Sequence, residues 1–474
     1  MKKSWVFVFS ENIFEILKKE LLKEKHLESQ GFLFGPIVDS SHEKRILIRE
    51  LWVLPKDAYE ERTSFSVRPK ANFLRKAATY AFLNNFVFID IHTHPFARKA
   101  MFSSIDRQLA QRFKRWVINV ERRQNKRFLY AHMVMTPEDI YGEVLDPETC
   151  EYSPARVRIL KTPFNITDME KEPFVFHTRF DRSIRLWSER NQKKLSQIKV
   201  AIVGLGGLGW NITESLARIG IRNFMLIDGD RIEESNLPRL LGAKPHEIGK
   251  YKVEALSDRI KAFWNGKANV ETIANYISKQ NYHLLKEADV IVGAVDNNLA
   301  RFILNEAAVR YLIPYFDLGI RIEASKDHAG GKIKYQGGQI IFVNPGTTPC
   351  LACYENFFDF FEIAEGFLND GEKRIRRELG YITDTQESPA PNVLPPNLLA
   401  VALFTNMFVN FITGISHISP IISFDLMSGQ IKNHEAQKPY QLCCVCSNRY
   451  GKFALGDLES QKVFVYENEN KTNC

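Results

Sequence analysis

The chain has 474 residues, more than one hydrophobic core usually supports, so its length predicts two or three domains. Hydrophobic residues make up 45% and charged residues 25%, which is the balance of a soluble globular protein. The formal net charge of +8 is a mild excess and does not by itself indicate nucleic-acid binding. Seven cysteines are too few for a disulfide framework in a chain of this length, and we expect a cytoplasmic protein.

Residues 1–165 predict a first domain of mixed helices and strands. An amphipathic helix is expected over 12–25, apolar strands over 31–38, 45–53 and 86–92, and a basic helix over 105–126. The charges of the basic helix are expected to form a solvated face or to dock an acidic partner, and nucleic acid is not an expected partner. Residues 166–178 are predicted to form a linker.

Residues 179–474 predict a second domain of α/β class. Strand-like runs at 200–203, 224–228, 290–295, 315–317 and 340–343 alternate with helical segments. Such alternation is typical of a mainly parallel sheet with helices on both faces. The apolar run 398–415 contains Asn406 and Asn410, so we expect a buried core helix and no membrane span. The polar stretch 365–396 is expected to be a mobile crossover segment.

Two histidines directly follow a strand-like run of the first domain. The run 86–91 leads into His92 and His94, and Asp106 follows where the basic helix begins. Histidines at positions i and i+2 of an extended chain point to the same side, so both imidazoles can face one metal ion. Three protein ligands leave the fourth tetrahedral position of zinc to water, as a catalytic site requires. The alternative is a pair of core histidines that lie by chance beside a helix-capping serine.

The pattern His-x-His-Pro, a gap, then Ser-x-x-Asp resembles the JAMM (JAB/MPN) family of zinc metallopeptidases and isopeptidases. That family also has a glutamate in a Glu-x-x-Gly pattern before an apolar strand, which is present here from Glu28 to Gly31. The resemblance implies an α+β domain in which His92, His94 and Asp106 bind a catalytic Zn²⁺. It also implies that Glu28 is the general base and acid, and that Ser103 helps to stabilise the tetrahedral oxyanion. The gap before Ser103 is slightly longer than usual in the family.

A glycine-rich turn follows the first predicted strand of the second domain. Its glycines are Gly204, Gly206, Gly207 and Gly209. A strand, such a turn and a helix N-terminus together form a phosphate cradle of backbone N–H groups. This motif alone equally indicates an NAD or FAD oxidoreductase.

Polar residues farther along the chain separate these two possibilities. A dinucleotide fold needs one acidic residue for a ribose. Cleavage of ATP between its α- and β-phosphates also needs cations for the leaving pyrophosphate and a carboxylate for Mg²⁺. Residues of these types are Asp228, Asp230, Asn236, Arg239, Lys252, Asp296 and Arg301. The series therefore predicts ATP chemistry.

This ordered series resembles the ThiF/MoeB and ubiquitin-activating superfamily over most of residues 179–450. The resemblance implies a Rossmann-like adenylation domain that binds ATP with Mg²⁺. The adenosine ribose is expected at Asp228, with Asp230 nearby, and Mg²⁺ at Asp296. The phosphates are expected at Asn236, Arg239 and Lys252.

Residues 179–182 have the sequence Arg-Phe-Asp-Arg, which resembles the superfamily's Arg-Tyr-x-Arg motif. The second arginine of that motif enters the nucleotide site of the neighbouring subunit. The resemblance therefore implies a catalytic role for Arg182 and a homodimer formed through the adenylation domain. A solvated surface arginine is the alternative.

Four of the seven cysteines form two Cys-x-x-Cys pairs, which are Cys350 with Cys353 and Cys443 with Cys446. Two such pairs can close a tetrahedral site of four thiolates with no open position, which is typical of structural zinc. The same arrangement occurs in ThiF/MoeB relatives. A redox dithiol is the alternative.

Ubiquitin-activating enzymes carry the activated carboxyl on a further cysteine, and this chain has none between Cys353 and Cys443. When the helix predicted to begin at Pro395 is aligned with its MoeB-type counterpart, Ser388 takes the place of that cysteine. Either the domain stops at the acyl-adenylate, or Ser388 accepts the acyl group as an oxyester. A third interpretation is a loop serine with no role, because no base for its hydroxyl is identifiable in the nearby sequence.

The two resemblances together imply a bifunctional enzyme, similar to bacterial ubiquitin-like conjugation systems. It would adenylate the C-terminus of a ubiquitin-like protein and would process or deconjugate that protein with zinc. A conjugating-enzyme-like protein would be a further partner. Some bacterial operons of this kind serve in antiviral defence, and that role is suggested here by analogy between operons alone. The alternative is processing and activation of a sulfur-carrier protein in cofactor or cysteine biosynthesis. A non-catalytic scaffold has no chemical need for Lys252 together with Asp296.

Overall fold

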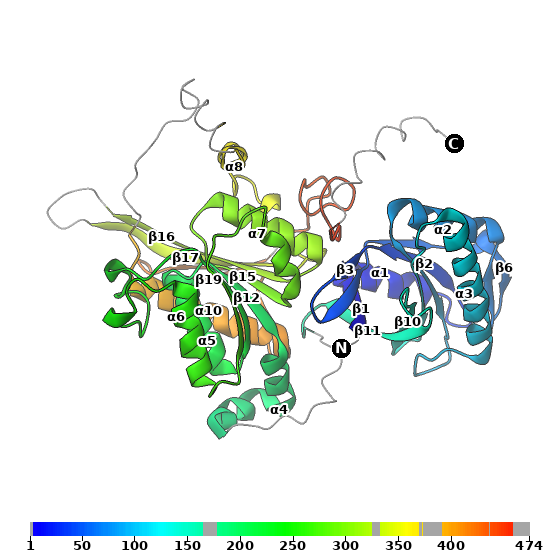
Figure 1. Cartoon of the computed structure of the whole chain (residues 1–474), viewed down its shortest axis with the longest axis horizontal. Coiled ribbons are helices and arrows are strands. Elements are labelled where there is room, and N and C mark those ends of the chain that lie inside the picture. The colour runs from blue at the N-terminus through cyan, green and yellow to red at the C-terminus, as the bar shows by residue number, and fades with distance from the viewer. Residues whose placement is uncertain are drawn as a thin grey trace.

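The computed structural model describes residues 3–164, 178–324, 332–368, 372, 391–435 and 437–457. The described residues form two large sheets. The strands of one sheet lie between residues 4 and 160 of the sequence, and the strands of the other lie between residues 199 and 434. Figure 1 shows the sheets and their helices as two lobes, with the last described segment of the chain between them. All but the last residue of the predicted linker lies outside the described residues.

The first lobe contains a nine-stranded sheet in the order β3-β4-β1-β11-β10-β9-β8-β2-β5. Its strands are β1 (Ser4–Ser10), β2 (Gln30–Gly35), β3 (Ile37–Asp39), β4 (Glu43–Leu47), β5 (Glu50–Val53), β8 (Val87–Thr93), β9 (Tyr130–Met135), β10 (Ile140–Leu145) and β11 (Tyr152–Leu160). Strands β6 (Tyr59–Arg62) and β7 (Val67–Pro69) form a separate pair. Helix α1 (Glu11–Leu21) covers one face, and α2 (Ala71–Asn84) and α3 (Ser104–Gln124) cover the other.

Local sequence explains where the helices of this lobe begin. The Ser10 side chain caps α1 by accepting a hydrogen bond from the Ile13 N–H, and the helix then buries Phe14, Leu17 and Leu21 along one stripe. Ser103 begins α3 with a reciprocal capping box to Asp106. The cap fixes the first turn of α3, and with it the backbone of Asp106.

The second lobe contains an eight-stranded sheet in the order β14-β13-β12-β15-β16-β17-β18-β19. Its strands are β12 (Lys199–Val203), β13 (Asn223–Ile227), β14 (Asn269–Ile273), β15 (Val290–Gly293), β16 (Tyr315–Ala324), β17 (Ile333–Val343), β18 (Ile421–Asp425) and β19 (Gln430–His434). The strands from β14 to β16 are parallel, which agrees with the predicted α/β class and a Rossmann-like arrangement.

The other half of this sheet is antiparallel. Run 340–343 belongs to β17, which pairs antiparallel with β16 so that Phe316 lies opposite Phe342. Strands β18 and β19 continue the antiparallel pattern. Sequential strands joined by a short connection can only pair antiparallel, and periodicity alone does not reveal how two strands are connected.

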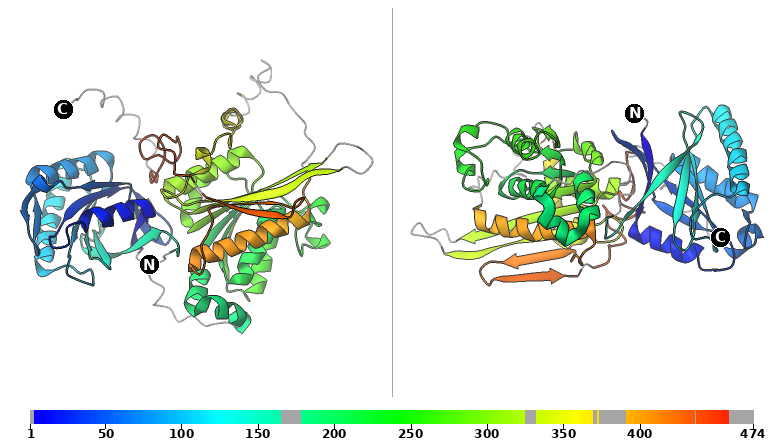
Figure 2. Two further views of the ribbon diagram at one scale, coloured as in Figure 1. Left: turned by 180° about the vertical axis from the view of Figure 1, so that it is seen from behind. Right: turned by 90° about the horizontal axis from the view of Figure 1, so that it is seen from below.

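Helices cover both faces of the second sheet (Figure 2). Helices α4 (Asp181–Gln197), α5 (Gly207–Ile219), α6 (Lys252–Phe263) and α10 (Leu394–Thr413) lie on one face, and α7 (Asn298–Tyr311) and α8 (Phe360–Gly366) lie on the other. By length and composition α10 is apolar enough to cross a membrane, but 67% of its most apolar stretch is buried inside the protein. It packs against α5 and the sheet, which favours the predicted core helix.

The two lobes share a continuous packed boundary. Val6, Val8 and Val38 of the first lobe join the hydrophobic cluster of the second. The side chain of Arg49 is buried at this boundary and donates hydrogen bonds to the carbonyl oxygens of Asn448 and Phe453. The Asn448 amide returns a hydrogen bond of 3.2 Å to the Arg49 carbonyl oxygen. A buried guanidinium therefore ties the first lobe to the last described segment.

We expect Arg49→Ala to lower the free energy of unfolding by about 3 kcal/mol, because it removes charged hydrogen bonds and leaves carbonyl oxygens buried. Urea denaturation followed by tryptophan fluorescence measures the change. Arg68→Ala is the control, since the Arg68 side chain is 62% exposed and its ion pairs are worth less than about 1 kcal/mol. Equal stability of the two variants would contradict the assigned role of Arg49.

Candidate functional site

The glycine turn lies where the order of the parallel strands reverses. Strands β12 and β15 are neighbours, and their connections leave toward opposite faces of the sheet, which opens a crevice at their carboxyl ends. Gly204 has a φ of 85°, a conformation that favours glycine. A side chain on Gly209 would lie 1.8 Å from the Gly204 carbonyl oxygen, so α5 can approach the turn only with glycine there. Gly206 caps α5, and Gly207 is its first residue.

Asp228 directly follows β13 and holds the glycine turn in place. Its carboxylate accepts hydrogen bonds from the backbone N–H groups of Leu205 and Asp230, the latter at 2.7 Å. Burial raises the pKa of Asp228, although Lys252 and the two N–H groups counteract this shift. The sequence indicated only a ribose contact for Asp228, and its contact with the turn had no sequence signal.

Lys252 and Asp230 form an ion pair, with 2.7 Å between Lys252 Nζ and Asp230 Oδ2. The Tyr276 hydroxyl donates a second hydrogen bond to Asp230. Burial would raise the pKa of Asp230, but these two hydrogen bonds outweigh it and lower the pKa. The hydrogen bond to Asp230 raises the pKa of Tyr276 to about 12. Tyr276 was missed by the sequence analysis because it stands in a loop without a motif.

Asn236 ends a short 3-10 helix after β13, Glu234–Asn236, and Arg239 lies in the turn that follows. The Asn236 side chain is buried and accepts a hydrogen bond from the Glu233 N–H at 3.3 Å. The Arg239 guanidinium donates to the Ser235 carbonyl oxygen at 3.0 Å. Asp296 follows β15, is exposed, and has Asn297 beside it.

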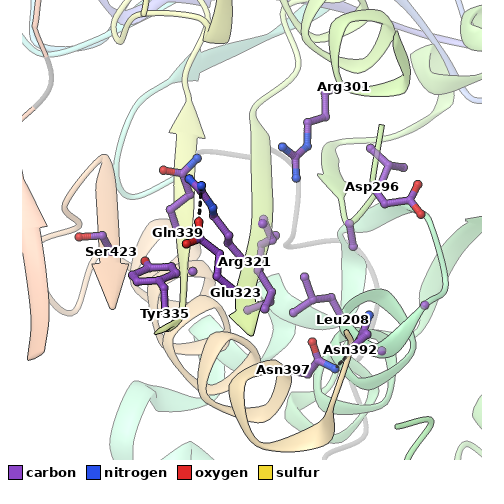
Figure 3. A pocket seen from close by; sticks show the side chains of 18 residues that line it. Leu208, Asp296, Arg301, Arg321, Glu323, Tyr335, Gln339, Asn392, Asn397 and Ser423 are labelled. Carbon is purple, nitrogen blue, oxygen red and sulfur yellow. Dashed lines mark hydrogen bonds and ion pairs between the residues drawn. The ribbon is translucent and has the colours of Figure 1, made fainter. Parts of the chain in front are cut away.

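A cavity of about 770 Å³ opens beside the glycine turn. Of the residues predicted to bind ATP, Gly206, Gly207 and Asp296 line this cavity. The cavity lining does not include Asp228, Asn236, Arg239 or Lys252. Its opposite wall belongs to the antiparallel half of the sheet, as Figure 3 shows. The polar lining residues on that side or on neighbouring helices are Arg301, Arg321, Glu323, Tyr335, Gln339, Asn392, Asn397 and Ser423. Except for Arg301, which follows Asp296 closely in sequence, these residues carried no motif.

Of the two further predicted catalytic residues of this lobe, the structure describes Arg182 alone. Arg182 is exposed near the start of α4, and the cavity lining does not include it. Its neighbour Arg179 donates instead to the Phe263 carbonyl oxygen. Ser388 lies outside the described residues.

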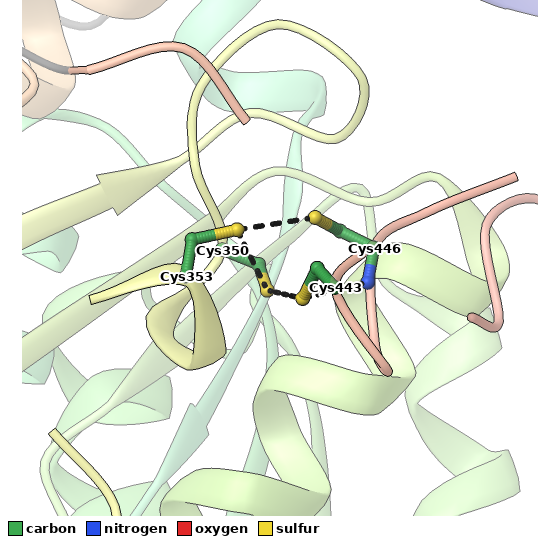
Figure 4. Close-up of side chains that lie close together, drawn as sticks. All are labelled: Cys350, Cys353, Cys443 and Cys446. Atoms are coloured by element: carbon green, nitrogen blue, oxygen red, sulfur yellow. Dashed lines mark hydrogen bonds between the residues drawn. The ribbon is translucent and has the colours of Figure 1, made fainter. Parts of the chain in front are cut away.

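The four predicted cysteines meet in one cluster (Figure 4). Sulfur–sulfur distances are 3.9 Å for Cys350–Cys353, 3.7 Å for Cys350–Cys443 and 3.3 Å for Cys353–Cys446. Tetrahedral zinc with Zn–S bonds of about 2.3 Å requires sulfurs roughly 3.8 Å apart, so the cluster fits structural zinc. The spare Cys444 is exposed.

His92, His94 and Asp106 form a second cluster, in the first lobe. The two histidine Nε2 atoms are 3.2 Å apart, and each lies near a different Asp106 oxygen, at 3.3 and 3.4 Å. Zinc bonds of about 2.0–2.1 Å require tetrahedral ligand atoms roughly 3.3 Å apart. The donor set therefore fits a zinc ion with one open position. The hydrogen bond and charge of Asp106 raise the pKa of His92 against the effect of burial.

Glu28 lies beside this cluster because of strand register. Gln30 of β2 pairs with His92 of β8, and the antiparallel register brings Glu28 toward His94. Its Oε1 atom is 3.8 Å from His94 Nε2, and the residue is 6% exposed. Burial raises the pKa of Glu28 against the opposing charges of the two histidines. Ser103 is exposed, and its hydroxyl oxygen accepts the Asp106 N–H as a helix cap.

A buried polar network supports the loop that leads to Asp106. Phe102 stacks on His132 with ring centroids 4.0 Å apart. Glu143 lies 3.3 Å from His132 and accepts hydrogen bonds from Arg107 and Tyr141. The hydrogen bonds lower the pKa of Glu143 to about 2 against the effect of burial. The sequence analysis missed this network because its members lie on three separate elements.

We expect Cys443→Ser to retain one equivalent of zinc less than the wild-type protein, because a tetrahedral thiolate site loses most of its affinity with one ligand. Metal analysis by inductively coupled plasma mass spectrometry checks the content. Cys444→Ser is the matched control and should retain the wild-type zinc content. Equal zinc content in all three proteins would rule out zinc at the four-cysteine cluster.

Comparisons with known proteins concern the second lobe. The model of the ThiF family matches residues 180–445. Ubiquitin-like modifier-activating enzyme 5 of Drosophila persimilis is 29% identical over 231 residues, which are 45% of this chain and 55% of that protein. The sulfur carrier protein ThiS adenylyltransferase of Bacillus subtilis is 32% identical over 165 residues, 34% of this chain and 45% of that protein. The chain thus spans about half the length of these curated relatives.

Among solved structures, Escherichia coli MccB with MccA-N7isoASN is similar over 58% of this chain and 75% of that chain, with 23% identity and a TM-score of 0.45. The family match covers more than half of the chain. It includes the glycine turn, Asp296 and three of the four clustered cysteines, Cys350, Cys353 and Cys443. The chain therefore belongs to the ThiF family.

Proposed function

We propose that the second lobe is an ATP-dependent adenylyltransferase that activates the C-terminal carboxylate of a ubiquitin-like or sulfur-carrier protein. The observation that carries this proposal is the single cavity that joins the glycine turn and Asp296 to the antiparallel half of the sheet. ATP would occupy the side of the glycine turn, which leaves the antiparallel side for a protein tail. The names of the two curated relatives, an activating enzyme and an adenylyltransferase, support the same class of reaction.

The reaction would join a carboxylate oxygen to the α-phosphorus of ATP and break the bond to the β-phosphate. The bonding electrons leave with pyrophosphate, so positive groups must stabilise it. Asn236, Arg239 and Lys252 would engage the phosphates, with Lys252 shared between ATP and Asp230. Asp296 would hold Mg²⁺, which supplies charge neutralisation on the phosphates when it is bound.

The product would leave as an acyl-adenylate or pass to Ser388 as an oxyester. The chain has no cysteine between Cys353 and Cys443, which supports transfer without a thioester on that segment. The sensitivity of a covalent adduct to hydroxylamine, with and without Ser388→Ala, separates the two routes. A homodimer in which Arg182 enters the partner's site remains part of the proposal, since Arg182 is exposed.

We expect Asp296→Asn to lower ATP–pyrophosphate exchange by about a hundredfold or more, because a metal ligand is lost. The assay uses ubiquitin-like and sulfur-carrier proteins encoded beside this gene. Asp258→Asn, on the exposed face of α6, is the matched control and should exchange like wild type. Equal exchange by Asp296→Asn and wild type with every candidate would refute the activation proposal. A conjugating-enzyme-like neighbour would favour protein modification, and a sulfur-transfer neighbour would favour biosynthesis.

We also propose that the first lobe is a zinc metallopeptidase of JAMM type that trims or removes the activated protein. The observation that carries it is the tetrahedral spacing of His92, His94 and Asp106 with Glu28 alongside. Zinc held there would lower the pKa of a bound water and polarise the scissile carbonyl. Glu28 would take a proton from water and deliver it to the leaving amine nitrogen. The Ser103 hydroxyl can still donate its own proton, to a developing oxyanion.

We expect Glu28→Gln to abolish cleavage of a modifier that carries a C-terminal extension, while zinc content stays unchanged, because the base is lost and the ligands remain. Cleavage is followed by mass spectrometry of the released tail. Glu15→Gln, on the exposed face of α1, is the control and should cleave like wild type. Cleavage that survives Glu28→Gln and chelation of zinc would exclude the peptidase.

A further inference from the structure

Arg301 belongs to the series that predicts ATP chemistry, but it has no separate role in the proposed adenylation reaction. Arg301 lies one turn into α7, after the Asn297 cap, and its side chain is 20% exposed. It lines the cavity together with Asp296 and Gly319. Figure 3 shows its guanidinium entering on the side of Asp296, away from Ser423. The side chain therefore lies between the phosphate side and the antiparallel side of the cavity.

A buried carboxylate holds this guanidinium. Asp317 of β16 is 0% exposed, and its Oδ1 atom lies 3.6 Å from Arg301 Nε. The same oxygen accepts a hydrogen bond of 2.7 Å from the Tyr315 hydroxyl. Burial raises the pKa of Asp317, and the charge of Arg301 counteracts this shift. An ionised carboxylate at such a position needs a nearby cation, so Asp317 fixes the place of Arg301.

The donors of Arg301 remain available to a ligand. Over the described ranges of the chain, its guanidinium donates no hydrogen bond. A guanidinium presents a planar fork of N–H groups that matches the two oxygens of a carboxylate or phosphate. A side chain on Gly319 would lie 2.9 Å from Arg301 Nη2, so the glycine makes room for the guanidinium.

In the proposed reaction the phosphates of ATP and the carboxylate of the protein substrate would meet in this cavity. The carboxylate has fewer candidate donors there than the phosphates. The phosphates already have the glycine turn, Arg239 and Lys252 as candidate donors. On the antiparallel side, the other lining arginine is Arg321, whose side chain is 75% exposed and paired with Glu323. Gly338 of β17 pairs with Ile320 of β16, and a side chain on Gly338 would lie 2.6 Å from the Gly319 carbonyl oxygen, so the two strands approach closely only with glycine there.

We propose that Arg301 binds the C-terminal carboxylate of the protein substrate, and that Asp317 and Tyr315 are positioning residues for Arg301. The inference rests on the proposed adenylation. As the carboxylate oxygen bonds to the α-phosphorus, its negative charge passes to the phosphate oxygens and pyrophosphate. Arg301 then donates to the carbonyl oxygen of the mixed anhydride, so it aligns the attacking group without a proton transfer.

The test compares two small probes by isothermal titration calorimetry. AMP carries only the nucleotide, and N-acetylglycyl-sulfamoyl adenosine also carries an acyl group in place of the activated C-terminus. We expect Arg301→Gln to weaken binding of the acyl probe by about tenfold or more, with less than about a twofold effect on AMP. Asp317→Asn should weaken the acyl probe less, and the double variant no more than Arg301→Gln.

Arg218→Gln makes the same substitution on an exposed part of α5 and serves as control for the loss of charge. Melting temperatures verify that each variant is folded. Equal losses for AMP and the acyl probe would assign Arg301 to the phosphate, and no loss for either would leave it without a role; both results overturn the inference. If wild type binds neither probe, the proposed adenylation itself fails, which is a distinct outcome.

Discussion

Parallel strands place all their carboxyl ends at one edge of a sheet, and the nucleotide site depends on that constraint. The glycine turn, Asp228 and Asp296 follow β12, β13 and β15, which are neighbours in the sheet but lie up to about ninety residues apart in sequence. Asp228 accepts a hydrogen bond from the Leu205 N–H of this turn, so one carboxylate couples the end of the second strand to the turn after the first. A change in strand order would separate these groups even if every side chain were kept.

The sequence predicts the parts of the site that depend on local spacing. The glycine turn, the His-x-His pair and both cysteine pairs are short motifs, and the structure brings their members together. Contacts between distant elements were not predictable, because they depend on register and packing. The stacking of Phe102 on His132 and the hydrogen bond from Tyr276 to Asp230 are examples. The direction of β17 was not predictable for the same reason, since residues 340–343 look alike in a parallel or an antiparallel strand.

The two metal clusters differ in what they leave open. Four cysteines surround one point with sulfur on all sides, which suits a metal with a purely structural task. In the first lobe three ligands would leave one position free, and the buried Glu28 lies 3.8 Å from one of them, His94. The same preference of zinc for four ligands would thus give a closed structural site in the second lobe and, under the proposed peptidase function, an open site in the first.

The contact between Arg49 and the carbonyl oxygens of Asn448 and Phe453 has a practical consequence for anyone who separates the two halves. A chain cut within residues 165–177 would yield a first half whose Arg49 guanidinium has lost its two carbonyl acceptors and faces water. The second half would keep the Asn448 and Phe453 carbonyl oxygens, which follow its second cysteine pair, without the Arg49 donor. Each fragment would expose apolar side chains such as Val6 and Val8 or their partners. The undivided chain with one candidate site inactivated is therefore better suited to studying either proposed activity alone.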